Sequence, residues 1–393
     1  MSPGPWLRLT ALGGAAGTLL AVVSGSAHLG AGHRVLAALA LPPLAAVVAA
    51  AWVSYRHLLP PALAALVLFG LAAAVTAPGL HLALAALAFA ASVVVAAWAF
   101  RGTRAPAGSW RDYVTLTKPR IMSLLLLTGF CGMVIGARGI PSAGLIVAAM
   151  AGLALACGGA SALNHVLDAD IDRLMGKRTR SRPVAAGRVS AAYALEFGLA
   201  LSALSFVLLA GVVNVLTAVL ALVGNLFYVL VYTRLLKRST PQNIVIGGAA
   251  GAVPPLVGWA AATGNLTLPA LVLFAVVFLW TPPHFWALAL LIKRDYAAAG
   301  VPMLPVVRGE SETARQIVLY TIALVAFTLA PALWGQFGVV YLVAAGALGG
   351  FFLWLAWRLR RERTPARAAL LFHYSLAYLA LLFVAMAADT VIA

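Results

Sequence analysis

Long apolar segments recur along almost the whole chain, and they limit its possible folds more than any other feature. Each runs for roughly 17–25 residues, enough for a helix to cross a hydrocarbon core about 30 Å thick. Mean hydropathy is +1.01 and only 9% of residues are charged, whereas about a quarter are charged in a typical soluble domain. Because the segments lack the alternating pattern of a β-barrel, the sequence predicts an all-α polytopic membrane protein.

The apolar pattern predicts about thirteen spans in two groups. We expect an N-terminal extension over residues 1–100 with about four spans, a polar linker over 101–118, and a nine-helix domain over 119–393. The predicted spans are 6–26, 34–54, 61–76, 78–100, 121–137, 141–163, 190–209, 211–232, 243–262, 268–291, 312–329, 335–357 and 365–391. The first span lacks the small-residue cleavage site of a signal peptide, so we expect it to be retained.

The formal charge of +17 raises the question of a nucleic-acid partner, but the basic residues lie in alternate loops of the nine-helix domain. Those loops hold all but four of the 27 Lys and Arg residues; the exceptions are Arg8, Arg34, Arg56 and Arg138. The positive-inside rule places such loops in the cytoplasm. We therefore expect no nucleic-acid partner, and a multi-pass protein of a prokaryotic plasma membrane in contact with lipid.

The stretch NHVLDADIDRLMGKRTRSRP, Asn164 to Pro183, holds three of the ten acidic residues within five positions. Asn164, Asp168 and Asp172 are spaced at i, i+4 and i+8, so on a helix they form one stripe of oxygen ligands, while Asp170 points the opposite way. Carboxylates at a helix C-terminus oppose the helix dipole, and burial in a membrane adds a cost on the order of 3 kcal/mol. Cations must compensate them.

Two compensating arrangements stay open. The first is local pairing with Arg173, Lys177 and Arg178. The second is Mg²⁺, which binds one or two carboxylates and completes its shell with water and substrate phosphate. The segment GKRTRSRP carries more positive charge than three carboxylates require. That excess favours a polyanion bridged through metal, such as a diphosphate, and would place the active site on the cytoplasmic side.

Other loops on the same predicted side supply matching groups. LTKPRI brings Lys118 and Arg120 to the start of the first late span, and YTRLLKRSTPQN brings Lys237 and Arg238. LIKRDY adds Asp295, followed by Tyr296. Each alone is typical of a residue that anchors a helix at the interface. Together with the aspartate stripe they predict a site that closes over a diphosphate from two sides.

These motifs resemble those of a known family. The first stretch resembles the N-x-x-x-D-x-x-x-D motif of the UbiA-type intramembrane prenyltransferases. YTRLLKRSTPQNIVIGGAAGAVPPLVGW, WTPPHFWALAL and DYAAAGVPMLPVVRG look like segments of the protohaem IX farnesyltransferases, or haem O synthases. The resemblance runs from Trp110 to about the C-terminus. It implies an all-helical bundle and an Mg²⁺-dependent enzyme that transfers farnesyl from farnesyl diphosphate to a vinyl group of haem B, with addition of water.

The resemblance also implies roles for individual residues. Asp168, Asp172 and Asp295 would be catalytic, and Asn164, Asp168 and Asp172 would hold the metal. The implied diphosphate contacts are Lys118, Arg120, Arg178, Arg182, Tyr232, Lys237 and Arg238. Many branches of the superfamily carry two spaced carboxylates in the second motif, whereas this chain has only Asp295 there. With a single carboxylate in that motif, the binding of a second metal ion there stays open.

Several polar and aromatic residues allow two interpretations. His284 in TPPHF is either a haem contact or a hydrogen-bonding group inside a helix, and Trp280, Phe285 and Trp286 either line a pocket or pack helices. His165 is expected to be structural. In the extension, GSAHLGAGH and GLHLALA faintly resemble haem A synthases, which leaves it as either a haem-binding half-bundle or an accessory bundle. A haem A synthase or oxidase assembly factors are conceivable partners.

Three competing functions follow from the same features. A prenyltransferase acting on a quinone precursor or another acceptor shares the aspartate motif, but the TPPHF and VPMLP segments argue against it. A phosphatidyl-transferring enzyme would need a D-G-x-x-A-R opening, which this motif lacks. A transporter predicts charge near the middle of the bilayer, whereas this chain places nearly all of its charge at one interface.

Overall fold

The computed structural model describes residues 5–26, 31–55, 58–74, 78–99, 106–333 and 337–392. The described residues are almost all helical and include no β-strand, only an isolated bridge between Ala107 and Val189. Ten helices are long and apolar enough to cross a membrane, and three shorter apolar helices accompany them. The chain is therefore an integral multi-pass membrane protein, as the apolar pattern predicts.

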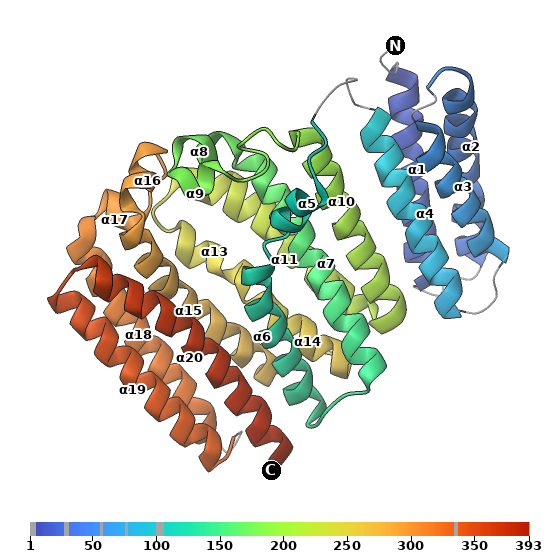
Figure 1. Ribbon diagram of the computed structural model, residues 1–393. Coiled ribbons are helices and arrows are strands. Elements are labelled where there is room, and N and C mark those ends of the chain that lie inside the picture. The colour runs from blue at the N-terminus through green and yellow to red at the C-terminus, as the bar shows by residue number, and fades with distance from the viewer. Residues whose placement is uncertain are drawn as a thin grey trace.

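The N-terminal extension is a four-helix unit at one side of the molecule (Figure 1). Its helices are α1 (Pro5–Ser26), α2 (Ala31–Val53), α3 (Leu59–Ala74) and α4 (Pro78–Ala99). Among the residues described in this extension, only α2 contains a span that meets the full length criterion, His33–Val53. The rings of His33 and His81 meet edge to face at 5.8 Å between centroids. His28 and His57 lie outside the described residues.

The described residues from 106 onward contain nine helical spans, and these form the larger bundle in Figure 1. In chain order they are α6 (Pro119–Ala137), α7 (Ala143–Leu167), α10 with η2 (Ala191–Leu208, Leu209–Val213), α11 with η3 and α12 (Val215–Leu226, Phe227–Leu236, Lys237–Ser239), α13 with α14 (Asn243–Gly251, Val253–Thr263), α15 (Leu268–Leu291), α18 (Gly309–Leu333), α19 (Val339–Arg361) and α20 (Pro365–Ile392). The nine-helix architecture with four preceding helices agrees with the prediction.

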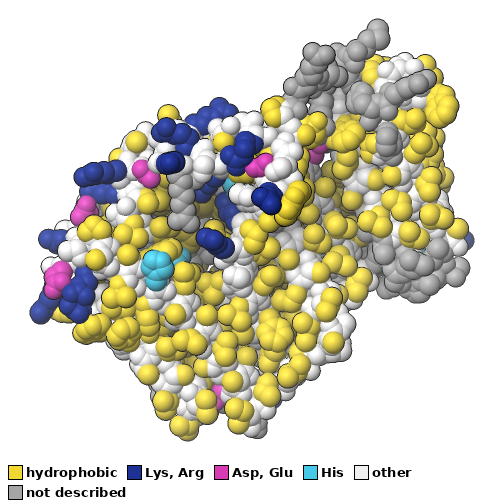
Figure 2. Space-filling view, in the orientation of Figure 1, with side chains coloured by type: hydrophobic (Ala, Val, Ile, Leu, Met, Phe, Trp, Pro, Cys, Tyr) yellow, Lys and Arg dark blue, Asp and Glu magenta, His cyan; other side chains and the backbone are white. Residues whose placement is uncertain are grey.

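Short helices gather at one end of this bundle, which we call the polar end. They are α8 (Ala169–Leu174), α9 (Lys177–Arg180), α16 (Lys293–Ala298) and α17 (Leu304–Val307), and they connect longer spans. Figure 2 shows Lys and Arg side chains gathered over this end and a hollow between some of them, while the opposite end is mainly hydrophobic. The charge asymmetry of the sequence is thus an asymmetry of the folded bundle.

Two segments differ from the sequence-based boundaries. The predicted span 211–232 instead begins at Val215, because the Asn214 side chain caps α11 by accepting a hydrogen bond from the Thr217 N–H, and its helix continues to Ser239. Lys237 and Arg238 therefore lie in the last helical turn and not in a loop. The predicted linker also contains a helix, α5 (Trp110–Leu116), which Ser109 and Asp112 start with a capping box.

Candidate active site

The aspartate stripe lies where α7 gives way to α8. Asp168 stands between the two helices with φ −92° and ψ 0°. Its N–H still donates to the Asn164 carbonyl at 2.9 Å, and the Asp172 N–H donates to the Asp168 carbonyl at 2.8 Å. The helical spacing therefore survives the break. Asn164, Asp168 and Asp172 are buried, whereas the side chain of Asp170 is 64% exposed.

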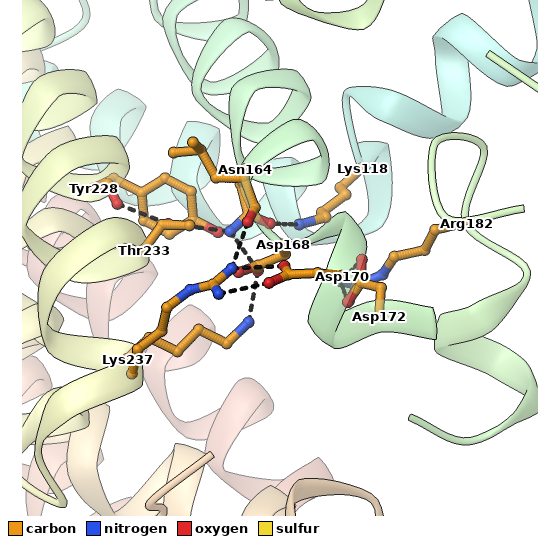
Figure 3. A network of polar contacts seen from close by, with 11 residues as sticks. Lys118, Asn164, Asp168, Asp170, Asp172, Arg182, Tyr228, Thr233 and Lys237 are labelled. Carbon is orange, nitrogen blue, oxygen red and sulfur yellow. Dashed lines mark hydrogen bonds and ion pairs between the residues drawn. The ribbon is translucent and has the colours of Figure 1, made fainter. Parts of the chain in front are cut away.

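Asn164 is the centre of a network that joins three parts of the chain (Figure 3). Its amide nitrogen donates to Asp168 Oδ2 at 2.8 Å and to Thr233 Oγ1 at 3.1 Å. Its amide oxygen accepts from Lys118 Nζ at 2.8 Å. Lys237 Nζ donates to the same Asp168 oxygen at 2.5 Å. The start of α6, the end of α7 and the η3–α12 segment thus converge on the Asn164–Asp168 pair.

The other two aspartates form separate ion pairs. Arg182 binds both oxygens of Asp172 at 2.8 and 2.9 Å. Burial raises the pKa of Asp172, and Arg182 opposes that rise. On the exposed side, Arg238 binds both oxygens of Asp170 at 2.7 Å, which lowers the pKa of Asp170 to about 2. Arg238 therefore belongs to the outer pair and not to the buried network.

Lys118 occupies an unusual position at the N-terminus of α6. Its backbone is left-handed, with φ 51° and ψ 60°, a conformation that is uncommon for a residue other than Gly. Burial and the neighbouring charge of Arg182 lower the pKa of Lys118 to about 7. Cations therefore crowd this side of the network, and an added anion would favour the charged ammonium.

The second motif approaches the network from α16. A Cβ atom on Gly176, in the loop between α8 and α9, would lie 2.5 Å from Asp295 Oδ2. The Asp295 carboxylate therefore packs closely against the Gly176 backbone, and a larger residue there would displace it. Burial raises the pKa of Tyr296 to about 12, and Arg182, Asp168 and Asp172 all act electrostatically on its hydroxyl. Asp295 and Tyr296 thus border the same site.

Two tyrosines extend the site along η3. Tyr228 and Tyr232 stack with 5.5 Å between ring centroids, and a Cβ on Gly247 would lie 2.3 Å from the Tyr232 ring. The Thr233 hydroxyl donates to the Tyr228 carbonyl at 2.9 Å while accepting from Asn164. Thr233 in η3 and Lys237 at the start of α12 therefore reach the network from one continuous helical segment.

Some residues of the sequence-based prediction lie elsewhere. The Arg120 side chain is exposed and makes no hydrogen bond or ion pair with the residues that the structure describes; only its backbone carbonyl accepts, from Ser123 Oγ at 2.9 Å. The Arg178 side chain lies outside the described residues. His284 is buried in α15, where Nδ1 is 2.7 Å from Ser375 Oγ and the ring stacks between Trp280 and Phe372. It thus belongs to the α15–α20 contact.

One oxygen atom of the site is available as a ligand for a hard cation. Asp168 Oδ1 is buried and has no hydrogen-bond partner among the described residues. Both oxygens of Asp172 are bound by Arg182, and the Asn164 oxygen accepts from Lys118. No group of three His, Cys, Asp or Glu side chains in the described ranges could alone hold a metal. The site thus suits Mg²⁺, which also uses water and phosphate oxygens.

Sequence reasoning missed Tyr228, Thr233 and His165. The spacing of Thr233 and Lys237, four residues apart, places them on one helix face and was a usable signal. His165 precedes Asp168 by three residues and Asp172 by seven, so it shares their face, although it is off the i, i+4, i+8 stripe. It is 2% exposed, and Lys118, Arg182 and Lys237 all act on it electrostatically. The network therefore extends beyond the motif to Thr233 and Tyr228, and His165 lies next to it in sequence, its ring without a hydrogen bond among the described residues.

Comparisons with known proteins identify the family to which this fold is similar. Residues 125–384 match the UbiA prenyltransferase family. The fold is similar to that of a digeranylgeranylglyceryl phosphate synthase, with a TM-score of 0.60 and 18% identity, over 72% of this chain and 99% of that one. It is also similar to a UbiA homologue from Archaeoglobus fulgidus bound to DMAPP and Mg²⁺, with a TM-score of 0.52 and 17% identity, over 68% and 99% of the chains.

Curated relatives are more similar in sequence. A protoheme IX farnesyltransferase of Symbiobacterium thermophilum is 55% identical over 281 residues, which cover 71% of this chain and 94% of the relative. One of Roseiflexus sp. (strain RS-1) is 53% identical over 282 residues, 72% of this chain and 53% of the relative. The chain thus spans about half the length of some relatives that it matches. By the family match and this identity, it belongs to the UbiA prenyltransferase family.

Proposed function

We propose that this protein transfers the farnesyl group of farnesyl diphosphate to a vinyl group of haem B, with addition of water, and so makes haem O. The observation that carries the proposal is the buried Asn164–Asp168–Asp172 network with its excess of cations at the polar end of an apolar bundle. The names of relatives more than 50% identical support haem as the acceptor.

The cations of the network would bind the diphosphate. Lys118, Arg182 and Lys237 contact the three ligands of the stripe, and together they carry more charge than Asp168 and Asp172 neutralise. The Archaeoglobus homologue was solved with a prenyl diphosphate and Mg²⁺, and Asp168, with Asp172 and Asn164 after their cations exchange, would hold that metal here. When bound, Mg²⁺ would neutralise phosphate charge as a Lewis acid.

The reaction follows from this charge distribution. The bond between farnesyl C1 and the diphosphate oxygen breaks, and both electrons leave with the diphosphate, where the cations of Lys118, Arg182 and Lys237 stabilise them. The apolar bundle keeps water from the allylic cation. The terminal vinyl carbon then supplies the electron pair for the new C–C bond. Water adds to the resulting cation beside the porphyrin and releases one proton, leaving a hydroxyethylfarnesyl substituent.

Charge also supports an orientation. We infer that the polar end faces the cytoplasm of a prokaryotic cell, because the basic loops gather there (Figure 2). Farnesyl diphosphate and the released diphosphate are anions and would exchange with that compartment. The N-terminal helices offer a surface for a downstream haem-modifying enzyme or an oxidase assembly factor.

Reconstitution with alternative acceptors tests the function. The full chain in lipid nanodiscs, with Mg²⁺ and farnesyl diphosphate, should convert haem B to a product heavier by one farnesyl and one hydroxyl group, detected by mass spectrometry. Mesohaem, which has ethyl in place of vinyl groups, should stay unchanged. Farnesylation of 4-hydroxybenzoate without reaction of haem B would instead establish the alternative function, transfer to a quinone precursor.

A further inference from the structure

His165 carries a polar ring that the network leaves without a partner. The side chain is 2% exposed. Neither ring nitrogen has a hydrogen-bond partner among the residues that the structure describes. Buried polar groups in native proteins almost always have a partner, and an exception calls for an explanation such as a ligand or ion. The imidazole is therefore a group whose partner is to be sought at the site.

The surroundings of the ring indicate the charge of that partner. His165 follows Asn164 directly and shares a helix face with Asp168 and Asp172. The groups that act on it electrostatically are the cations Lys118, Arg182 and Lys237. Each of these cations already binds one ligand of the stripe, Asn164, Asp172 or Asp168. Three cations within electrostatic reach of an imidazole that has no hydrogen-bond partner among the described residues favour an anion at this part of the site.

We propose that His165 is a further diphosphate-binding residue, whose imidazole N–H donates a hydrogen bond to an oxygen of the prenyl diphosphate. This inference rests on the proposed function only in its choice of substrate. A neutral imidazole offers one donor and one acceptor. The donor suits a phosphate oxygen, and the acceptor suits a neighbouring ammonium such as that of Lys118, whose Nζ also donates to Asn164.

The arrangement gives His165 a role different from that of the aspartates. Asp168 and Asp172 are anions that need a cation between themselves and phosphate, whereas the imidazole contacts phosphate directly. An N–H donor fixed on α7 would hold the diphosphate in register with the metal-binding carboxylates. His165 would thus affect binding of the diphosphate group and leave recognition of the acceptor unchanged.

Direct binding measurements test the role. Titration calorimetry on the full chain in nanodiscs, with Mg²⁺ and no haem, would compare farnesyl diphosphate with farnesol. His165→Phe should weaken binding of farnesyl diphosphate by about tenfold or more, the effect of one lost hydrogen bond to a charged group. Farnesol affinity and the melting temperature should stay near wild type. His165→Asn and His165→Gln, which keep an N–H donor, should recover part of the affinity.

The matched control is His373→Phe, because His373 is an exposed histidine of α20. It should change none of these quantities. Unchanged affinity of His165→Phe for farnesyl diphosphate would overturn the proposal, and so would an equal loss of farnesol binding, which would indicate a structural role. If wild type binds farnesyl diphosphate in this way but modifies no haem, the proposed acceptor is wrong while the role of His165 stands.

Discussion

At the scale of single residues, the site pairs buried carboxylates with cations. Asp168 and Asp172 are buried, and the effective cost of burying an isolated carboxylate would be several kcal/mol. Lys237 and Arg182 compensate them directly. Asp170 stands two residues away from each but is exposed and pairs with Arg238. The three aspartates therefore differ in environment, and their substitutions should differ in effect.

We expect Asp168→Asn and Asp172→Asn each to reduce farnesyl transfer by roughly a hundredfold or more, because each removes an anionic ligand with little change of volume. Asp170→Asn should stay within about threefold of wild type, since a surface ion pair contributes little. Turnover measured on purified, folded protein checks this difference. Three variants with equal loss of activity would contradict the assignment of the buried face.

His284 allows a test that separates acceptor from donor. We expect His284→Ala to weaken haem B binding or turnover while leaving Mg²⁺-dependent binding of farnesyl diphosphate near wild type, with the reverse for Asp168→Asn. The reason is that His284 lies in α15 seven positions before its end at Leu291, roughly 10 Å along the helix axis from the polar end. Haem titration and farnesyl diphosphate calorimetry measure the two affinities.

Ser375→Ala is the control for this pair, because it removes the partner of His284 Nδ1 and keeps the imidazole. If Ser375→Ala and His284→Ala lower the melting temperature equally and neither changes haem affinity, His284 is a packing residue. Loss of farnesyl diphosphate binding in His284→Ala would show that the substrates are arranged differently from our proposal.

At the scale of helices, close backbone contacts hold the bundle together. The α6–α14 pair is the clearest case: a Cβ on Gly258 would lie only 1.8 Å from the carbonyl oxygen of Gly129. Small residues at the interfaces between membrane helices allow such a close approach. In lipid the hydrophobic effect does not drive helices together, so van der Waals packing stabilises their association. Since Lys118 is at the N-terminus of α6, this packing also positions one cation of the site.

We expect Gly258→Ala to lower the free energy of unfolding by about 1–3 kcal/mol, because α6 and α14 must move apart to make room for a methyl group. The matched control is Gly346→Ala in α19, where an added Cβ meets nothing within 4 Å. There the better helix propensity of Ala should leave stability unchanged or slightly higher. Thermal unfolding in detergent compares the two, and equal melting temperatures would contradict the α6–α14 contact.

At the scale of the whole molecule, the N-terminal extension packs against α10 of the nine-helix domain. Trp98 Nε1 donates to Glu196 Oε2 at 2.7 Å, and the Glu196 side chain is buried. Apolar residues from both parts, among them Phe89 and Val207, form one cluster that also joins α4 and α10. The extension therefore covers a carboxylate that would otherwise face lipid, although all residues of the site lie beyond it.

Deletion of residues 1–105 should leave farnesyl transfer per folded molecule within about threefold, because the site is kept whole. It should also lower the melting temperature, since exposure of Glu196 to lipid costs on the order of 3 kcal/mol. In the truncated chain, Glu196→Leu should recover part of that stability. A folded but inactive truncated protein would show that the extension contributes to the site, and an unchanged melting temperature would contradict the α4–α10 contact.

The sequence alone determined the membrane-embedded helical class, the nine-plus-four arrangement and the stretch that carries the chemistry. These features are local: a span is read from the length and polarity of one segment, and the Asn164–Asp168–Asp172 spacing from the period of one helix. Even the exposure of Asp170 follows from that period. Segments far apart in the chain could only be assigned to the same predicted side.

The tertiary structure decided which of those segments meet. Arg120 and Lys118 are two residues apart, yet only Lys118 contacts Asn164, because the left-handed turn before α6 directs it inward. Lys237 joins the network and Arg238 the outer pair because η3 and α12 carry the helix beyond the predicted span. Thr233 enters the site through packing between η3 and α7. Such contacts depend on how elements pack in space, and local sequence pattern does not encode that packing.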